Sequence, residues 1–342
     1  MAETRAAVLV DFGQVELREL NSRHLTEHQV LVDVMFSGVC GSQLMEYRGK
    51  RGPDRWLPHL FGHEGVGIVR ELGPQVGKVA VGDRVGLTWI SGSGSDCDPI
   101  AYDSESGLVN AGQVATLATS VVVAESRVYR LPDRVSDRMA VLLGCALPTG
   151  AGMAFSALEY GHPRYVAVVG LGGVGMSALL ATLSFRAEGV IAVDTNDGRL
   201  DYARSLGVES VVNPRQSPLV EHLKKLTGDK LDLVLESSGN ASSLEQCFEA
   251  LSRRGRLVFA SHPPAGVKIS VDPHQLLSGK GIHGSWGGDV SPEVDTDRLL
   301  NVADRMSSGF NSLLGSEFRL DDIQTALDAM ERGEVIRPLI RM

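Results

Sequence analysis

The sequence predicts an α/β protein that joins a β-barrel-like domain to a doubly wound parallel sheet. Three observations support this prediction. The first third of the chain holds many short strand-like runs separated by glycine and polar turns. From residue 165 onward, apolar strand-like runs alternate with helical segments. At the start of that alternation, a glycine-rich turn lies between a strand and a helix.

Composition places the chain among globular enzymes. Its 342 residues are enough for two domains, and 43% apolar with 22% charged residues is ordinary for a globular protein. The net charge of −9 argues against nucleic acid or an anionic membrane as the main partner, because both require a basic surface. The N-terminus has no apolar core of signal-peptide length, and four scattered cysteines indicate reduced thiols. We therefore expect a cytoplasmic enzyme.

Strands dominate the prediction for the first domain. They are expected at residues 5–10, 14–18, 29–36, 120–123 and 127–131. Between residues 88 and 112, loop-forming residues gather and residues 102–110 are polar with no clear period, which predicts a long loop.

The second domain is predicted from alternating strands and helices. Strands are expected at residues 166–169, 190–193, 209–212, 231–235 and 256–260. Helices are expected at 176–185, 197–206, 218–228 and 240–254, with two more near 300–306 and 320–332. This order implies a parallel sheet that binds its ligand at the carboxyl ends of the strands.

The glycine-rich turn has the GxGxxG spacing of a dinucleotide site. Gly170 allows the tight turn, Gly172 admits a pyrophosphate, and Gly175 lets helix and strand pack closely. The N-terminus of the following helix attracts phosphate oxygens. Asp194 follows about 20 residues later, where its carboxylate would bind the ribose hydroxyls and repel a 2′-phosphate. NAD is therefore favoured over NADP.

The same stretch has an alternative interpretation as a membrane span, because no charge occurs between Arg164 and Arg186. The glycines interrupt it, and Ser177, Thr182 and Ser184 lower its hydropathy. The dinucleotide interpretation is preferred.

Three separate strings supply candidate metal ligands. GVCGSQ contains Cys40, GHEGVG contains His63 and Glu64, and GCALPTG contains Cys145. Two thiolates and an imidazole suit zinc. Their spacing alone is weak support, because a lone cysteine is more often a small buried hydrophobe.

These strings, together with PHLFGHEGVGIV, VGDRV, GLGGVG with Asp194, and Ile336-Arg337-Pro338, follow a recognisable order over nearly the whole chain. The chain thereby resembles the zinc-containing medium-chain dehydrogenase/reductase family of the alcohol dehydrogenase type. The resemblance implies a GroES-like catalytic domain of residues 1–147 and 289–342 around a Rossmann domain of residues 148–288. It implies an NAD-dependent oxidoreductase acting on a small alcohol or carbonyl compound.

The resemblance also assigns roles to residues. Cys40, His63 and Cys145 resemble the catalytic zinc ligands, and Glu64 resembles a glutamate that approaches the metal. Ser42 would hydrogen-bond the substrate oxygen and pass on its proton, Thr149 would lie against the nicotinamide, and Arg337 would meet the pyrophosphate. The implied cofactor-binding set is Thr149, Gly170, Gly172, Gly173, Val174, Gly175, Asp194, Arg199 and Arg337.

The chain departs from the family pattern at three places. Only Cys97 lies where four cysteines would hold a structural zinc, so we expect one catalytic zinc and no structural zinc. Gln43 replaces an aspartate that supports the zinc-bound histidine, so it would orient His63 without raising its basicity. Met45 replaces the histidine that ends the proton relay.

The substrate and the assembly are less well determined. Hydrogen-bonding side chains of the loop at 91–112 and of the residue after it suggest a polyol, cyclitol or sugar-like substrate. The alternative is that these side chains simply face water. They are Asp96, Asp98, Tyr102, Asp103, Asn110 and Gln113. A strand at 267–271 would form the sheet edge through which a homodimer or homotetramer assembles. The rivals are a zinc-free NADPH quinone or enoyl reductase on the same fold, and a non-catalytic dinucleotide-binding protein.

Several conspicuous residues are expected to have structural roles. His59 is expected in the packed interior or in a loop. Surface or hinge positions are expected for His262, His274 and His283. Burial in the core is expected for Cys247, Trp56, Trp89 and Trp286.

Overall fold

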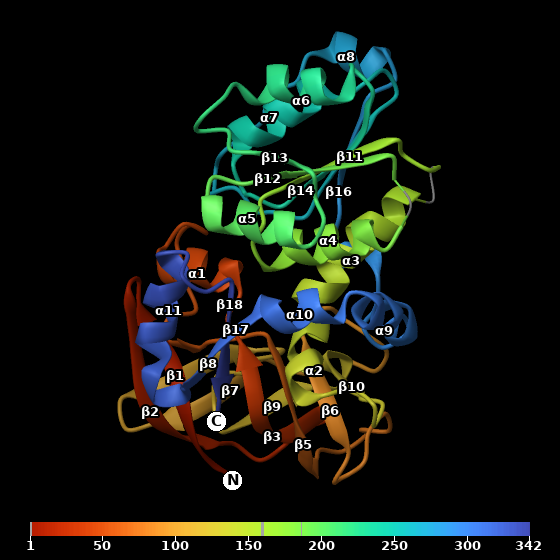
Figure 1. Cartoon of the computed structure of the whole chain (residues 1–342). Helices are drawn as coiled ribbons and strands as arrows, with labels where there is room; N and C mark the ends of the chain where they lie inside the picture. The colour runs from red at the N-terminus through yellow and green to blue at the C-terminus, as the bar shows by residue number, and fades with distance from the viewer. Residues whose placement is uncertain (1, 159–160, 186) are drawn as a thin grey trace. The chain divides into compact units, whose positions relative to one another are not determined.

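A computed structural model describes residues 2–158, 161–185 and 187–342 (Figure 1). The chain forms two compact units. Unit 1 comprises Met1–Ala146, Ser291–Asp297 and Asn311–Met342, and unit 2 comprises Leu147–Val290 and Arg298–Phe310. The sequence-based division assigned all of 289–342 to the first domain, whereas residues 298–310 belong to unit 2. There, the Tyr202 hydroxyl donates to the Gly309 carbonyl at 2.9 Å.

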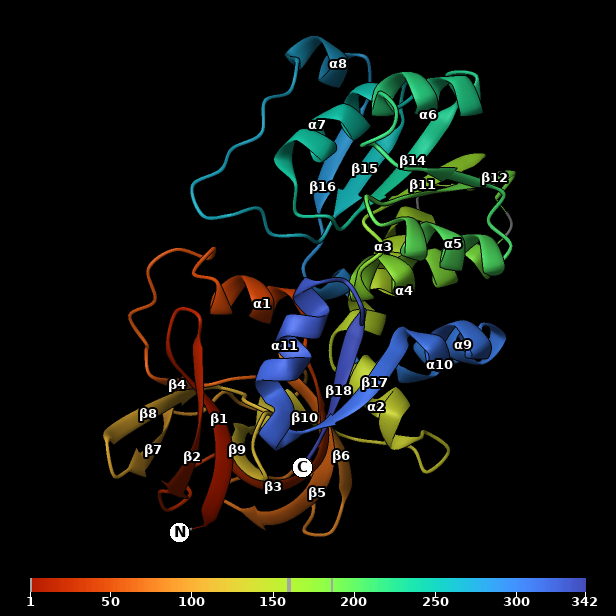
Figure 2. The ribbon, with the colours of Figure 1, turned by 60° about the vertical axis from the view of Figure 1, so that its left-hand side comes forward.

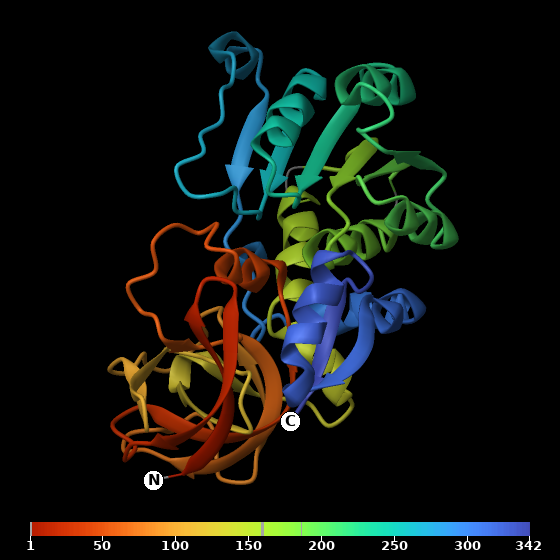
Figure 3. The same cartoon turned by 90° about the vertical axis from the view of Figure 1, so that its left-hand side faces the viewer.

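Unit 1 contains a closed barrel and a seven-stranded sheet. In Figure 3 its red to yellow strands curve around the barrel interior. The barrel strands are β1 (Glu3–Asp11), β2 (Gln14–Ser22), β4 (His59–Leu60), β7 (Ile100–Ser104) and β8 (Gly107–Gly112). The sheet strands are β3 (Gln29–Gly38), β5 (Glu64–Leu72), β6 (Arg84–Thr88), β9 (Ser120–Ala124), β10 (Val128–Arg130), β17 (Leu314–Arg319) and β18 (Arg337–Arg341). The helices are α1 (Gly41–Tyr47), α2 (Asp137–Leu143) and α11 (Ile323–Glu331).

The predicted long loop at 88–112 is wrong in its second half, because β7 and β8 form an antiparallel hairpin there. Tyr102 and Val109 are opposite one another and both point into the barrel core. Their neighbours Asp103 and Leu108 are exposed. Buried and exposed residues therefore alternate in these strands, but each strand is too short for this period of two to be recognised in the sequence.

Unit 2 is built on a six-stranded sheet whose neighbouring strands are all parallel, in the order β13-β12-β11-β14-β15-β16. The strands are β11 (Tyr165–Val169), β12 (Gly189–Val193), β13 (Ser210–Val212), β14 (Leu231–Glu236), β15 (Arg256–Phe259) and β16 (Gly281–Gly284). Figure 2 shows α6 (Leu219–Thr227) and α7 (Ala241–Ala250) on one face, with α4 (Gly173–Leu183) and α5 (Asp197–Ser205) on the other. The remaining helices of this part are α3 (Ala146–Leu158), α8 (Pro273–Leu277), α9 (Thr296–Arg305) and α10 (Ser307–Leu313). The predicted α/β fold class, barrel plus doubly wound sheet, is confirmed.

Local signals set most helix ends in unit 2. Asn196 caps α5 by accepting from the backbone N–H of Arg199 at 3.1 Å. Gly228 ends α6 in the left-handed conformation. The predicted strand at 267–271 is wrong: these residues have no regular structure, and β16 forms that edge of the sheet instead.

Among the described residues, no single helix is both long and apolar enough to cross a membrane. The bent pair α2 and α3 passes that test by length and composition only.

Candidate metal centre and dinucleotide site

Three candidate ligands, far apart in the sequence, meet in unit 1. Cys40 precedes α1, His63 immediately precedes β5, and Cys145 lies between α2 and α3. Their ligand atoms all lie within 4.8 Å of one another, and the two Sγ atoms are 3.8 Å apart. Both cysteines are buried and neither forms a disulfide. The structure therefore brings together two thiols and an imidazole in a protected site.

The polar atoms of this centre fit a zinc ion. His63 Nε2 is buried without a hydrogen-bond partner, although a ring nitrogen in such a place requires one. Contact with the Cys145 thiol lowers the pKa of the Cys40 thiol well below its ordinary value, helped by the Arg337 guanidinium. The pKa of Cys145 moves upward because of its contact with Cys40 and its burial. The lowered pKa of Cys40 favours a thiolate at this centre, which is the charged sulfur that zinc prefers.

Behind the thiols lies a fully buried ion pair between Glu64 and Arg337. Gly38 makes room for it, because a Cβ there would lie 2.4 Å from Glu64 Oε1. Burial raises the pKa of Glu64, and Arg337 opposes that effect. Glu64 Oε1 and Arg337 Nε both lack a hydrogen-bond partner. Arg337, expected at a pyrophosphate, thus contacts the carboxylate beside the metal centre.

The first turn of α1 positions the neighbouring residues. Gln43 is buried, and its side-chain oxygen accepts from the backbone N–H of Cys40 at 2.6 Å. It therefore fixes the backbone of Cys40 rather than hydrogen-bonding His63 as expected. Ser42 and Met45 lie on the same short helix and are partly exposed.

In unit 2 the glycine-rich turn connects β11 to α4. Gly170 has a φ of +81°, and a Cβ on Gly175 would lie 1.7 Å from the carbonyl oxygen of Gly170. Both positions therefore require glycine. A Cβ on Gly172 would meet nothing within 4 Å, which leaves open space before the first turn of α4, where Gly173 and Val174 lie. This arrangement fits the approach of a phosphate group.

Asp194 directly follows β12 and holds the turn in place. Its Oδ2 accepts from the backbone N–H of Leu171 at 2.6 Å, and its Oδ1 accepts from Asn196 N at 2.8 Å. Arg199 Nη1 lies 3.6 Å from Oδ2. Each carboxylate oxygen can accept a second hydrogen bond, so ribose hydroxyls remain compatible with this geometry. In α3, Thr149 Oγ1 is buried and has no hydrogen-bond partner among the described residues.

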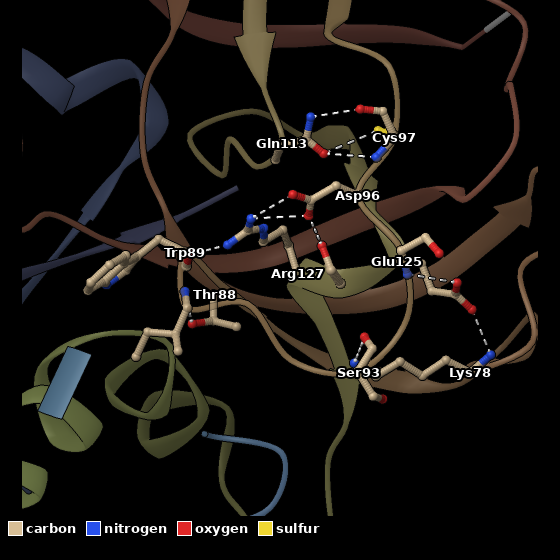
Figure 4. A network of polar contacts seen from close by, with 12 residues as sticks. Lys78, Thr88, Trp89, Ser93, Asp96, Cys97, Gln113, Glu125 and Arg127 are labelled. Atoms are coloured by element: carbon tan, nitrogen blue, oxygen red, sulfur yellow. Dashed lines mark hydrogen bonds and ion pairs between the residues drawn. The ribbon is translucent and has the colours of Figure 1, made fainter. Parts of the chain in front are cut away.

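Most polar residues proposed for a hydroxylated substrate already form contacts within unit 1; Figure 4 shows two of them, Asp96 and Gln113. Asp96 accepts from Arg127 at 3.1 Å, and Gln113 bonds the backbone of Cys97. The others are also engaged: Tyr102 with Val122, Asp103 with Arg23, and Asn110 with Trp56. Asp98 is exposed.

Two expectations for single residues need correction, and one is confirmed. Trp56 and Trp286 are 51% and 68% exposed, so their predicted burial is wrong. Cys247 lies in the core of unit 2, as predicted. His59 contacts Asp54 and Glu46, a cluster that sequence reasoning missed because its members come from separate elements.

Two protein families match the chain, one in its first half and the other in its second half. The alcohol dehydrogenase GroES-like domain matches residues 26–133, and the zinc-binding dehydrogenase family matches residues 173–304. Together with the thiolate–imidazole centre, these matches define the chain as a zinc-binding dehydrogenase.

Whole-chain relatives agree. The S-(hydroxymethyl)glutathione dehydrogenase of Synechocystis sp. is 27% identical over 367 residues, covering 99% of each chain. A solved alcohol dehydrogenase zinc-binding domain protein from Burkholderia ambifaria aligns with a TM-score of 0.90 at 27% identity, covering 100% of this chain and 99% of that one. Benzyl alcohol dehydrogenase from Acinetobacter calcoaceticus aligns with a TM-score of 0.88 at 29% identity, covering 100% of both. The chain belongs to the zinc-containing medium-chain dehydrogenase/reductase family of the alcohol dehydrogenase type.

Proposed function

We propose that the protein catalyses reversible, NAD-dependent oxidation of an alcohol to a carbonyl compound at a single zinc ion. In this reaction the alcohol carbon loses a hydride to the nicotinamide and the hydroxyl group loses a proton. The observation that carries the proposal is the meeting of Cys40, His63 and Cys145, with His63 Nε2 left without a partner.

Cys40, His63 and Cys145 would hold the zinc. When bound, zinc supplies a Lewis acid that favours ionisation of the alcohol and polarisation of the carbonyl. Ser42 would hydrogen-bond the substrate hydroxyl and relay its proton, giving up its own hydroxyl proton toward solvent as it accepts the proton of the substrate. Arg337 holds the Glu64 carboxylate by an ion pair, while Glu64 Oε1 has no hydrogen-bond partner among the described residues.

The cofactor residues of unit 2 would orient the dinucleotide. The N–H groups at Gly172, Gly173, Val174 and Gly175 would cradle the pyrophosphate. Asp194 would accept from the ribose hydroxyls beside Arg199, and Thr149 would contact the nicotinamide. Arg337 Nε has no partner and would donate to the pyrophosphate, as the family resemblance implies.

For the substrate we propose the secondary hydroxyl of a polyol, cyclitol or sugar-like compound. Its support from the 91–113 segment is reduced, because Asp96, Asn110 and Gln113 are engaged within the protein. The relatives act on other alcohols according to their names, so the substrate panel must include benzyl alcohol and S-(hydroxymethyl)glutathione beside the polyols.

A combined metal and substrate assay tests the proposal. We expect about one zinc per chain at the thiolate site, reduction of NAD rather than NADP, and turnover with at least one alcohol of the panel. Zinc-independent reduction of quinones or enoyl compounds by NADPH would replace the proposal with a reductase. Dinucleotide binding without turnover across the panel would leave a non-catalytic binding protein. Light scattering tests the proposed homodimer or homotetramer, and fractionation tests the proposed cytoplasmic location.

A further inference from the structure

A second group of metal-ligating side chains lies in unit 1, outside the thiolate centre. Glu46 belongs to α1, Asp54 to the segment that follows it, and His59 to strand β4. Their ligand atoms also lie within 4.8 Å of one another. His59 Nε2 is 3.1 Å from Asp54 Oδ2 and 3.9 Å from Glu46 Oε1.

The hydrogen bonds of His59 define which ring nitrogen faces the carboxylates. Its Nδ1 is 2.7 Å from the carbonyl oxygen of Leu60, which can only accept, so Nδ1 carries a proton. In the neutral ring, Nε2 then directs its lone pair at the carboxylate of Asp54. This arrangement is unfavourable unless a cation, either a proton or a metal ion, occupies the space at Nε2.

The distances allow a single metal ion to contact all three side chains. A proton on Nε2 would bond Asp54 alone, because Glu46 Oε1 at 3.9 Å lies beyond hydrogen-bond reach. Ligands at about 2.1 Å from a tetrahedral ion lie about 3.4 Å apart, which falls between the two observed separations. A single ion would therefore satisfy all three side chains.

Charge and supporting contacts agree with this assignment. Two carboxylates and a neutral imidazole give a net charge that matches a divalent cation. The cationic group recorded beside Glu46, Arg51 Nη1, is 3.9 Å away, and its side chain is 49% exposed. Asp54 Oδ1 accepts from the backbone N–H of Trp56 at 2.8 Å, so both Asp54 and His59 have the outer hydrogen bond that orients metal ligands.

The site is also accessible. The side chains of Glu46, Asp54 and His59 are 24%, 16% and 12% exposed, so an ion can enter and water can complete its coordination. We propose that these three residues form a second divalent-metal site. Its oxygen and nitrogen ligands would bind a divalent ion of the series from Mn²⁺ through Zn²⁺. Such an ion would tie the segment after α1 to the barrel strand β4.

A cobalt titration of the full-length Cys40→Ala/Cys145→Ala variant separates the two sites. We expect about one equivalent of Co²⁺ to bind, with visible d–d bands and without thiolate charge-transfer absorption. Adding Asp54→Asn or His59→Gln should abolish this binding. The matched control is His28→Gln. His28 Nδ1 also lies 3.2 Å from a carboxylate, that of Glu125, but among the described residues this pair belongs to no group of three candidate metal ligands. A folded double-cysteine variant that binds no cobalt would overturn the proposal.

Manganese binding to the otherwise native chain provides a second measurement that needs no cysteine substitution. Mn²⁺ prefers oxygen ligands over thiolates, so we expect about one equivalent by electron paramagnetic resonance titration. His59→Gln should weaken this binding at least about tenfold, and His28→Gln should leave it unchanged. Equal affinity in the wild type and in His59→Gln, or a His59 ring protonated at both nitrogens in the presence of the ion, would contradict the assignment. Neither measurement depends on the proposed alcohol oxidation.

Discussion

Two buried glutamates of unit 1 are paired very differently. Glu64, beside the Cys40, His63 and Cys145 centre, has Arg337 as its ion-pair partner, and its Oε1 has none. Glu125 accepts from the backbone N–H groups of Gly77 and Lys78 at 2.8 and 3.0 Å. It also lies 3.2 Å from His28 Nδ1. Figure 4 shows Glu125 in the contact network of the 91–113 segment.

The difference indicates what each region contributes. An unpaired buried polar atom costs about 1–3 kcal/mol, so a stable fold normally pairs such groups. The metal centre keeps several unpaired atoms, among them His63 Nε2, Glu64 Oε1 and Arg337 Nε. We conclude that the unpaired atoms of the metal centre suit a ligand, while the carboxylate of Glu125, which accepts from two backbone N–H groups, mainly stabilises the fold.

The largest effect is expected from Cys40→Ala. Removing this ligand should abolish zinc binding and lower kcat/KM for alcohol oxidation by more than about 100-fold, because even indirect support of a metal ligand is worth that much. Zinc analysis and NAD reduction measure the effect. Cys247→Ala is the control, since Cys247 is an equally buried thiol in the core of unit 2. Wild-type turnover in Cys40→Ala would contradict the assignment of a catalytic role to the metal centre and not to the Glu125 network.

A large loss of stability is expected from Arg337→Met. It leaves Glu64 as a buried carboxylate without its counter-charge, which should lower the free energy of unfolding by about 3–5 kcal/mol. The Glu64→Gln/Arg337→Met double variant should recover much of that loss, because no buried charge remains. Urea unfolding of the single and double variants measures the coupling. Additive losses would show that the two residues act independently.

A smaller loss is expected from Glu125→Gln, since an amide oxygen replaces only part of what the carboxylate accepts. The free energy of unfolding should fall by about 1–3 kcal/mol, while zinc content and kcat stay at the wild-type level. Denaturant unfolding and NAD reduction test both parts. A marked drop in zinc content would mean that this network also supports the metal centre.

The smallest expected effect is the pH dependence of the stability difference between the wild type and Glu125→Gln. Burial raises the pKa of Glu125, but the backbone N–H groups of Gly77, Lys78 and Ser95 outweigh it, so the pKa lies below its ordinary value of 4.5. A lowered pKa gives stability that is present above the ordinary value and is lost as the pH falls through the lowered one. The stability gap between wild type and Glu125→Gln should therefore narrow in acid. A gap that widens there would contradict this account.

Local features of this chain were predictable, and features that depend on distant contacts were not. The turn at Gly170 to Gly175 and the cap at Asn196 are decided by neighbouring residues, so the sequence indicates them directly. The strand at 267–271 was wrongly expected because its β-branched residues pair with no strand among the residues that the structure describes, and Val267 is 47% exposed. Strand β18 was missed because it lies between β17 and β3 in the sheet, and β3 is far away in the sequence.

The candidate site shows the same division. Cys40, His63 and Cys145 were identified through motifs, since no spacing rule connects residues that converge from three elements. The Glu46, Asp54 and His59 cluster has no such motif and became visible only from its distances. The ion pair of Arg337 with Glu64 was likewise missed, because β5 and β18 are brought near each other only in the folded sheet, where they flank β3.

Reversible removal of the metal tests the central claim most directly. The wild-type protein, stripped with a chelator that removes the thiolate-site zinc, should lose alcohol-dependent NAD reduction and regain it on addition of about one equivalent of Zn²⁺. Full turnover in the protein freed of zinc would contradict the account.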